Sequence, residues 1–126
     1  MEYWRKYLEV AMRFLRSAER ILDESPEAVP LLAHRALEHM IMALAYHYTP
    51  EEASLLNTHG HRRSWISRMI HEDKLPYRLL QVFDELTRVY KRSTYLLENG
   101  ELARRSLELA EEALGIVKEL LKSGAR

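Results

Sequence analysis

The stretch that decides the fold is LLAHRALEHMIMALAYHY, residues 31–48. Its apolar residues recur at steps of three and four, which is the spacing of one face of an α-helix, and no strand-like alternation appears in it. We expect this helix to start at Ser25-Pro26, because serine caps helices and proline is favoured in the first turn. The predicted apolar face, whose small alanines permit close helix approach, comprises Val29, Ala33, Ala36, Leu37, Met40, Ile41, Leu44 and Tyr48.

Three more long helices are predicted from the same spacing on either side of this stretch. They cover residues 3–22, about 76–97 and about 101–122, and Asn99-Gly100 is a stop and turn signal between the last two. After the second long helix, the capping-box spacing of Thr49 and Glu52 predicts a short helix through Leu56, and another short helix is predicted over about 62–72. This pattern predicts an all-α fold, an up-and-down four-helix bundle with an extra short helix or two between the second and third long helices. We expect residues 1–126 to form a single helical domain.

The composition narrows the classes of function. The chain has 19 basic and 19 acidic residues, so no global basic field drives it onto nucleic acid or membrane. It has no cysteine, which excludes disulfides, thiolate zinc sites and thiol catalysis. The start of the chain is charged and no apolar run reaches membrane-spanning length, so we expect a cytoplasmic protein without membrane contact. Glutamine occurs once and asparagine twice, a scarcity of amides that is typical of thermophiles.

The richest stretch in chemical groups is THGHRRSW, residues 58–65. Arg62 and Arg63 are expected in the first turn of a helix, where free N–H groups also favour anions. Guanidinium groups suit phosphate, so basic clusters here and near residue 90 are candidates for an anion or nucleotide site, with a solvated basic face as the alternative. Trp65 is expected in the core or in an interface, because Met69 follows it at helical spacing. The anion-site candidates are Arg62, Arg63, Arg68, Arg88, Lys91 and Arg92.

The histidines do not form a recognisable metal motif. His59 and His61 flank a glycine without a carboxylate nearby, and His34 and Glu38 are a single pair four residues apart. Carboxylate-bridged helical bundles use a Glu-x-x-His motif on each of two helices, and this chain contains none. We therefore expect no metal and no cofactor, and we expect His59 to be structural, its ring capping the start of the next helix. No nucleophile elbow or phosphate-binding glycine loop is present, so no catalytic residue is predicted.

The order of these segments resembles the HEPN family (higher eukaryotes and prokaryotes nucleotide-binding), in particular its small stand-alone archaeal and bacterial members. LLAHRALEHMIMALAYHY is similar to the family's second helix, with Ala36, Glu38, Ala43 and Leu44 in register. NTHGH is similar to the family's Thr-His-Asp, carried here by Thr58 and His59. The segment from residue 85 to residue 120 looks like the tyrosine-bearing fourth helix and the alanine-rich fifth.

The chain also departs from that family. Active HEPN ribonucleases carry an arginine, four to six residues, and then a histidine, and no histidine here has an arginine at that distance upstream. Arg35 and His39 have three residues between them, and Arg63 and His71 have seven. His39 and Met42 replace the two lysines of the family's second helix, and Thr94-Tyr95 stands where many members have Arg-Tyr.

The resemblance implies a homodimer and leaves three functions open. The first is a non-enzymatic domain that binds a nucleotide, RNA or a partner protein, as one half of a toxin–antitoxin or nucleotidyltransferase-associated pair. The second is a metal-independent ribonuclease with a displaced pair, Arg63 with His71 or Arg35 with His39, in which histidine transfers protons and arginine holds phosphate. The third is a purely structural interaction module.

Overall fold

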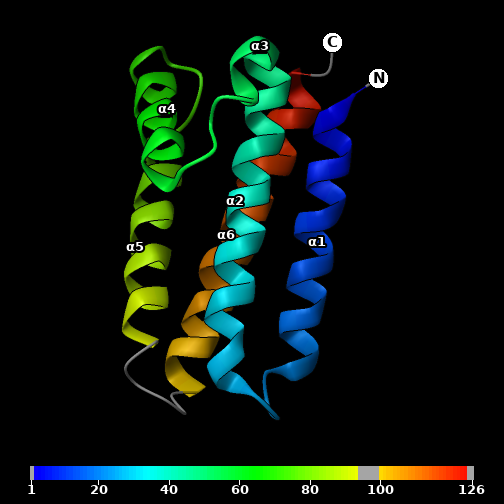
Figure 1. The fold of residues 1–126 in the computed structure, drawn as a ribbon, viewed down its shortest axis with the longest axis vertical. Coiled ribbons are helices and arrows are strands. Elements are labelled where there is room, and N and C mark those ends of the chain that lie inside the picture. Colours follow the sequence, from blue (N-terminus) through cyan, green and yellow to red (C-terminus); the bar gives the residue numbers. More distant parts are fainter. Residues whose placement is uncertain (1, 94–99, 125–126) are drawn as a thin grey trace.

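The computed structural model describes residues 2–93 and 100–124. Four long helices, α1 (Tyr3–Ile21), α2 (Val29–Tyr48), α5 (Tyr77–Ser93) and α6 (Gly100–Gly124), lie along the long axis and alternate in direction (Figure 1). A 3₁₀ helix, η1 (Pro26–Ala28), precedes α2, and α3 (Pro50–Ala53) and α4 (His59–His71) lie between α2 and α5. The predicted all-α bundle with short helices between its second and third long helices is confirmed, and the described residues contain no strand.

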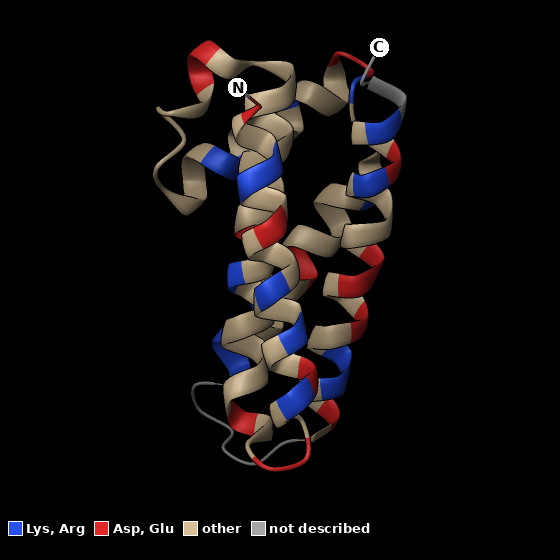
Figure 2. Ribbon diagram, turned by 90° about the vertical axis from the view of Figure 1, so that its right-hand side faces the viewer, with Lys and Arg blue, Asp and Glu red and all other residues tan. Residues whose placement is uncertain are grey.

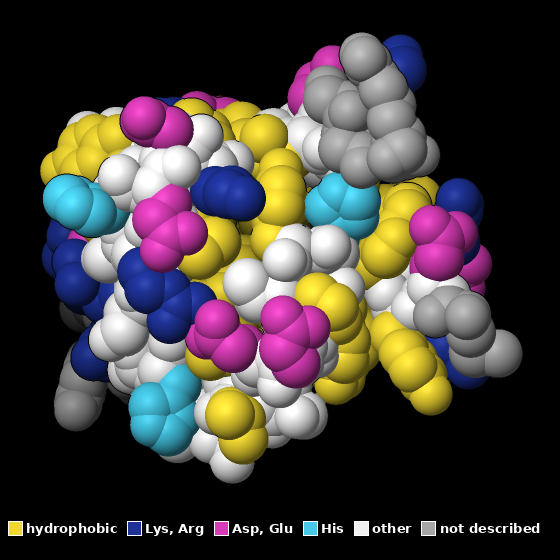
Figure 3. All heavy atoms as spheres, turned by 90° about the horizontal axis from the view of Figure 1, so that it is seen from above, with side chains coloured by type: hydrophobic (Ala, Val, Ile, Leu, Met, Phe, Trp, Pro, Cys, Tyr) yellow, Lys and Arg dark blue, Asp and Glu magenta, His cyan; other side chains and the backbone are white. Residues whose placement is uncertain are grey.

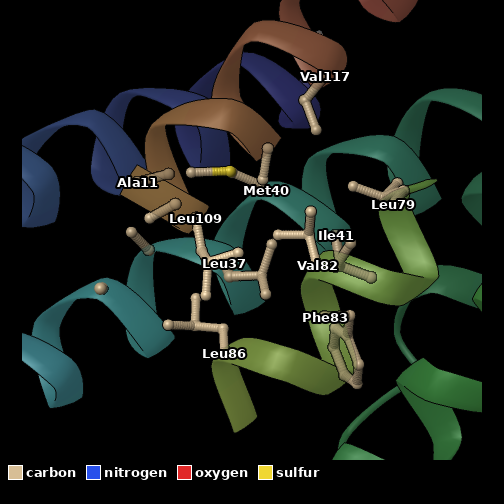
Figure 4. Close-up of a cluster of buried hydrophobic side chains, with 14 of the residues drawn as sticks. Ala11, Leu37, Met40, Ile41, Leu79, Val82, Phe83, Leu86, Leu109 and Val117 are labelled. Atoms are coloured by element: carbon tan, nitrogen blue, oxygen red, sulfur yellow. The ribbon is translucent and has the colours of Figure 1, made fainter. Parts of the chain in front are cut away.

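The core lies where the apolar faces of α2, α5 and α6 meet, with α1 and α4 closing it from either side. Figure 4 shows side chains from several helices converging there, among them Met40 and Phe83. Both are fully buried, as is Trp65 of α4 at 2% exposure, so the expectation that Trp65 belongs to the core is confirmed. Each such side chain contributes about 1.5–3 kcal/mol by leaving water. The alanine-rich face of α2 is inaccessible to solvent at Ala33 and Ala36, which agrees with close helix approach.

At two of the predicted helix starts, the expected side-chain capping hydrogen bond does not form. Ser25 makes no side-chain capping bond, and the chain forms η1 before α2 begins at Val29. Thr49 does not form a capping box with Glu52. Its hydroxyl donates to the Ala45 carbonyl at 3.3 Å and accepts from the indole N–H of Trp65 at 2.9 Å. The tertiary contact with α4 therefore takes the oxygen that a capping box would have used.

The short helices also differ from the expected ranges. The helix predicted through Leu56 ends at Ala53 after one turn, and α4 begins at His59 rather than near residue 62. Thr58 is the N-cap of α4, because its hydroxyl oxygen accepts a hydrogen bond from the backbone N–H of His61 at 3.0 Å. Thr94, Tyr95, Leu97 and Asn99 lie outside the described residues.

Charges of both signs are interleaved along the helices, as Figure 2 shows, which agrees with the balanced composition. Within residues 2–93 and 100–124, no helix is long and apolar enough to cross a lipid bilayer.

Candidate functional site

A pocket of about 380 Å³ opens where α1, α2, α3 and the first turn of α4 meet. Its lining carries two tyrosines and several ionisable side chains: Tyr7, Arg35, Glu38, His39, Tyr46 and Arg62. Most of these come from α2, because the residues at 35, 38, 39, 42 and 46 follow the helical spacing on the face beside its buried stripe. Mixed aromatic and polar lining of this kind suits a small ligand with a planar ring and a charged group.

The aromatic side of the pocket is formed by α1 and α2. The rings of Tyr7 and Tyr46 stack with centroids 5.1 Å apart and planes 17° from parallel. Burial, followed by the hydrogen bond with Tyr46, raises the pKa of Tyr7, so this phenol stays protonated at neutral pH. The His39 ring lies 6.0 Å from Tyr7 and 5.2 Å from Phe14 between centroids. Its Nδ1 lies 2.8 Å from the Arg35 carbonyl oxygen, which can only accept, so Nδ1 carries a hydrogen and donates it to that carbonyl.

The polar side of the pocket centres on Glu38. Its Oε2 accepts a hydrogen bond from Arg62 Nη1 at 3.0 Å, and its Oε1 lies 3.7 Å from Nδ1 of His34. The Arg62 and Glu38 side chains are 18% and 21% exposed, so Arg62 is a largely buried cation and does not belong to a solvated basic face, the alternative offered by the sequence. Arg35, in contrast, is exposed, and its guanidinium has no ion pair among the described residues.

Behind Glu38, a stack of rings joins three helices. His34 of α2 stacks on Tyr90 of α5 at 4.8 Å, and the ring of His59 lies 5.9 Å from His34 and stacks on Phe83 at 4.7 Å, all between centroids. Burial lowers the pKa of both histidines, more than the nearby Glu38 raises it, so both rings stay neutral at pH 7. The expectation that the His59 ring caps α4 is wrong, since Thr58 does so and the ring packs on Phe83.

The three candidate arginines of α4 each hold α4 to a different element. Arg62 pairs with Glu38 of α2. Arg63 donates two hydrogen bonds of 2.8 Å to Asp84 of α5, which hold the pKa of that carboxyl below its usual range. Arg68 Nη2 donates a hydrogen bond of 2.6 Å to Oε2 of Glu52, which belongs to α3. Such pairs compensate much of the charge that these arginines would offer to an anion.

The basic residues near residue 90, which are Arg88, Lys91 and Arg92, do not all lie in the same place. The positive charge of Arg88 helps to lower the pKa of Asp84. The positive charge of Lys91 likewise helps to lower the pKa of His59. Both therefore lie near the first turn of α4, on its α5 side. Arg92 instead faces a second pocket of about 560 Å³ together with Arg104 and Arg105 of α6. The structure thus brings Arg62, Arg63, Arg88 and Lys91 to one region and leaves Arg68 and Arg92 outside it.

The profile of the HEPN domain family matches residues 4–125. The chain belongs to the HEPN family. No curated protein and no solved structure matches it. HEPN domains often have functions related to nucleotides or RNA, and they often form dimers.

Sequence reasoning missed several site residues of this HEPN domain. The helical spacing places Tyr7 only on the apolar face of the first helix, and Tyr46 has no predicted role, yet both form the aromatic wall of the pocket. Arg35 was considered only as the partner of His39, and Asp84 not at all. The pairing of Arg62 with Glu38 spans 24 residues, so no local pattern signals it.

Proposed function

We propose that this HEPN domain binds a phosphate-bearing ligand, a nucleotide or RNA, at the pocket beside the first turn of α4. The observation that carries the proposal is that two basic side chains, Arg35 and Arg62, line this pocket. Three more, Arg63, Arg88 and Lys91, lie on the α5 side of the same helix turn, and Glu38 and Asp84 pair with Arg62 and Arg63. Arg35 is the primary phosphate contact, since its guanidinium is exposed at the pocket without an ion pair within the described residues. Tyr7 and Tyr46 offer aromatic surface to a base.

The test is fluorescence anisotropy with a labelled single-stranded oligouridine, competed with ATP, over a series of salt concentrations. Arg35→Ala should weaken binding and lower the salt dependence by about 0.7 in log–log slope for each lost contact, because one fewer counterion is displaced. The fold should persist, since His39 bonds to the backbone carbonyl of Arg35 and not to its side chain. Arg20→Ala, at an exposed arginine in the last turn of α1, is the matched control. Equal effects of both variants, or no binding by the wild-type protein, would reject the site and leave a purely structural module.

A metal-independent ribonuclease is the second candidate function, and the position of His39 favours it. Arg35 and His39 line the same pocket, and His39 binds the Arg35 carbonyl through Nδ1, which leaves Nε2 to take a proton from a ribose hydroxyl while the Arg35 side chain holds the phosphate. The other displaced pair is less suited, because Arg63 is held by Asp84 at the start of α4 and His71 is its last residue. Cleavage of single-stranded RNA in EDTA that disappears in His39→Ala supports this candidate, and binding without cleavage rejects it.

We also propose that the domain acts as a homodimer that uses the end of the bundle holding α3. Among the described residues, four large apolar side chains are exposed, and three of them, Tyr3, Leu55 and Tyr77, belong to segments at this end, where Figure 3 shows apolar surface. Exposed apolar surface of this kind is typical of an interface. Sedimentation equilibrium should give about twice the chain mass of 14.9 kDa. Leu55→Glu should yield monomers, whereas Leu31→Glu, at the opposite end, should not.

Family membership supports a protein partner as well. We propose that the domain is one half of a toxin–antitoxin pair or the companion of a minimal nucleotidyltransferase. Co-expression with the product of an adjacent gene, followed by co-purification, tests this pairing, and a domain that elutes without that product contradicts it.

A further inference from the structure

His34, Glu38 and His59 meet at the junction of α2 and α4. One ring nitrogen of each histidine and one carboxylate oxygen of Glu38 lie within 4.8 Å of one another. His34 and Glu38 stand one helical turn apart on α2, and His59 is the first residue of α4. The sequence predicts no metal site because the third ligand is distant in the chain, and only the packing of α4 on α2 supplies it.

His34 is free to accept a further partner. It is 8% exposed, and its Nε2 has no hydrogen-bond partner among the described residues. Its Nδ1 is 3.7 Å from Glu38 Oε1, which is too long for a hydrogen bond. A buried imidazole without hydrogen bonds is rare in folded proteins, unless an ion or ligand satisfies it.

Neighbouring side chains hold the three side chains in place. Arg62 Nη1 binds Glu38 Oε2 at 3.0 Å, so the other oxygen remains on the His34 side. Ligating carboxylates are commonly held in this way by a hydrogen bond to their second oxygen. Tyr90 stacks on His34 and Phe83 on His59, which fixes both ring planes. Glu38 and Arg62 also line the pocket described above, so the cluster lies beside it.

We propose that His34, Glu38 and His59 bind one divalent transition-metal ion of the zinc class. Two imidazoles and one carboxylate are a ligand set of open zinc sites, which leave a fourth position for water or a substrate oxygen. A doubly charged ion next to Arg62, with Glu38 as its one carboxylate ligand, leaves an excess of positive charge. An anionic oxygen, from hydroxide or phosphate, therefore suits the fourth position on the side of the pocket. The ion site rests on its own three ligands and does not depend on phosphate binding.

Isothermal titration of EDTA-stripped, dialysed protein with zinc chloride tests the site. We expect one ion per chain, a zinc-dependent rise in melting temperature, and visible absorption typical of a four-coordinate site when cobalt(II) replaces zinc. His59→Ala and Glu38→Gln should each weaken binding roughly tenfold or more and remove the rise in melting temperature. His61→Ala is the matched control, because this exposed histidine lies on the same helix turn and contacts Asn57 instead.

Two outcomes would overturn the site. In the first, the wild-type protein binds no stoichiometric zinc. In the second, His61→Ala weakens binding as much as His59→Ala, which would assign the ion to surface histidines. Glu38→Gln keeps the test decisive if His59→Ala fails to fold, since glutamine preserves the size and a hydrogen-bonding oxygen of the side chain.

Discussion

Replacing Arg62 by methionine should destabilise this domain strongly, although a surface arginine is ordinarily dispensable. Arg62 is 18% exposed and its partner Glu38 is 21% exposed, so the substitution leaves a mostly buried carboxylate without its cation. Loss of one partner of a buried pair costs about 3–5 kcal/mol, whereas an exposed pair contributes about 0–1 kcal/mol. Both groups are partly exposed, and the substitution also removes the buried, unpartnered Nε of Arg62. We therefore expect the free energy of unfolding to fall by about 2–3 kcal/mol.

Chemical denaturation and thermal melts in EDTA measure this loss, which corresponds to roughly 6–10 °C in melting temperature for a chain of this size. Arg63→Met is the matched control, one residue away on α4, because the Arg63 side chain is 48% exposed and its pair with Asp84 faces solvent. It should cost less than about 1 kcal/mol. The double variant Arg62→Met with Glu38→Gln should recover part of the loss, since no uncompensated charge remains. If Arg62→Met costs no more than Arg63→Met, burial does not set the energy of this ion pair and the reasoning is wrong.

Three further outcomes are expected. Thr58→Ala should lower stability by about 1 kcal/mol in denaturant titrations, because the N-cap of α4 loses its acceptor, while Thr58→Ser should not. Asp73→Gly should raise stability by roughly 0.5–1 kcal/mol, because Asp73 has φ 59° after α4 and glycine adopts this conformation without strain; an unchanged or lower midpoint would contradict this. Arg63 lowers the pKa of Asp84, so their pair stabilises the fold above the unfolded value of about 3.9 and is lost as pH falls through the lower folded value. Melts at pH 7 and below pH 4 should therefore show a smaller acid loss for Asp84→Asn than for the wild-type protein.

The helices could be predicted from the sequence because their signal is local. The three- and four-residue spacing of residues 29–48 predicts α2, and the same spacing predicts α1, α6 and the start of α5 to within a few residues of their observed bounds. The predicted end of α5 lies outside the described residues. Burial of Trp65 follows from the same rule. A helix exposes one stripe to the core whichever helices cover it, so a pattern within the chain is sufficient.

Capping was harder to predict because one hydroxyl can serve several partners. Thr49 has capping-box spacing, yet its oxygen accepts from Trp65, which lies 16 residues further on. Ser25 precedes a proline as a capping serine would, but η1 intervenes before α2. Thr58, which does cap α4, was noted only for its resemblance to a family motif.

The sequence by itself determined the four long helices, the bundle class and the residues available for chemistry. Only the tertiary structure decided which of those residues meet. Arg62 reaches Glu38 across 24 residues and Arg63 reaches Asp84 across 21, and His59 joins His34 only because α4 packs beside α2 and α5. Hydrogen-bonded helices form from neighbours in the chain, whereas the site forms from side chains whose distance depends on how whole helices pack, and that distance has no counterpart in local spacing.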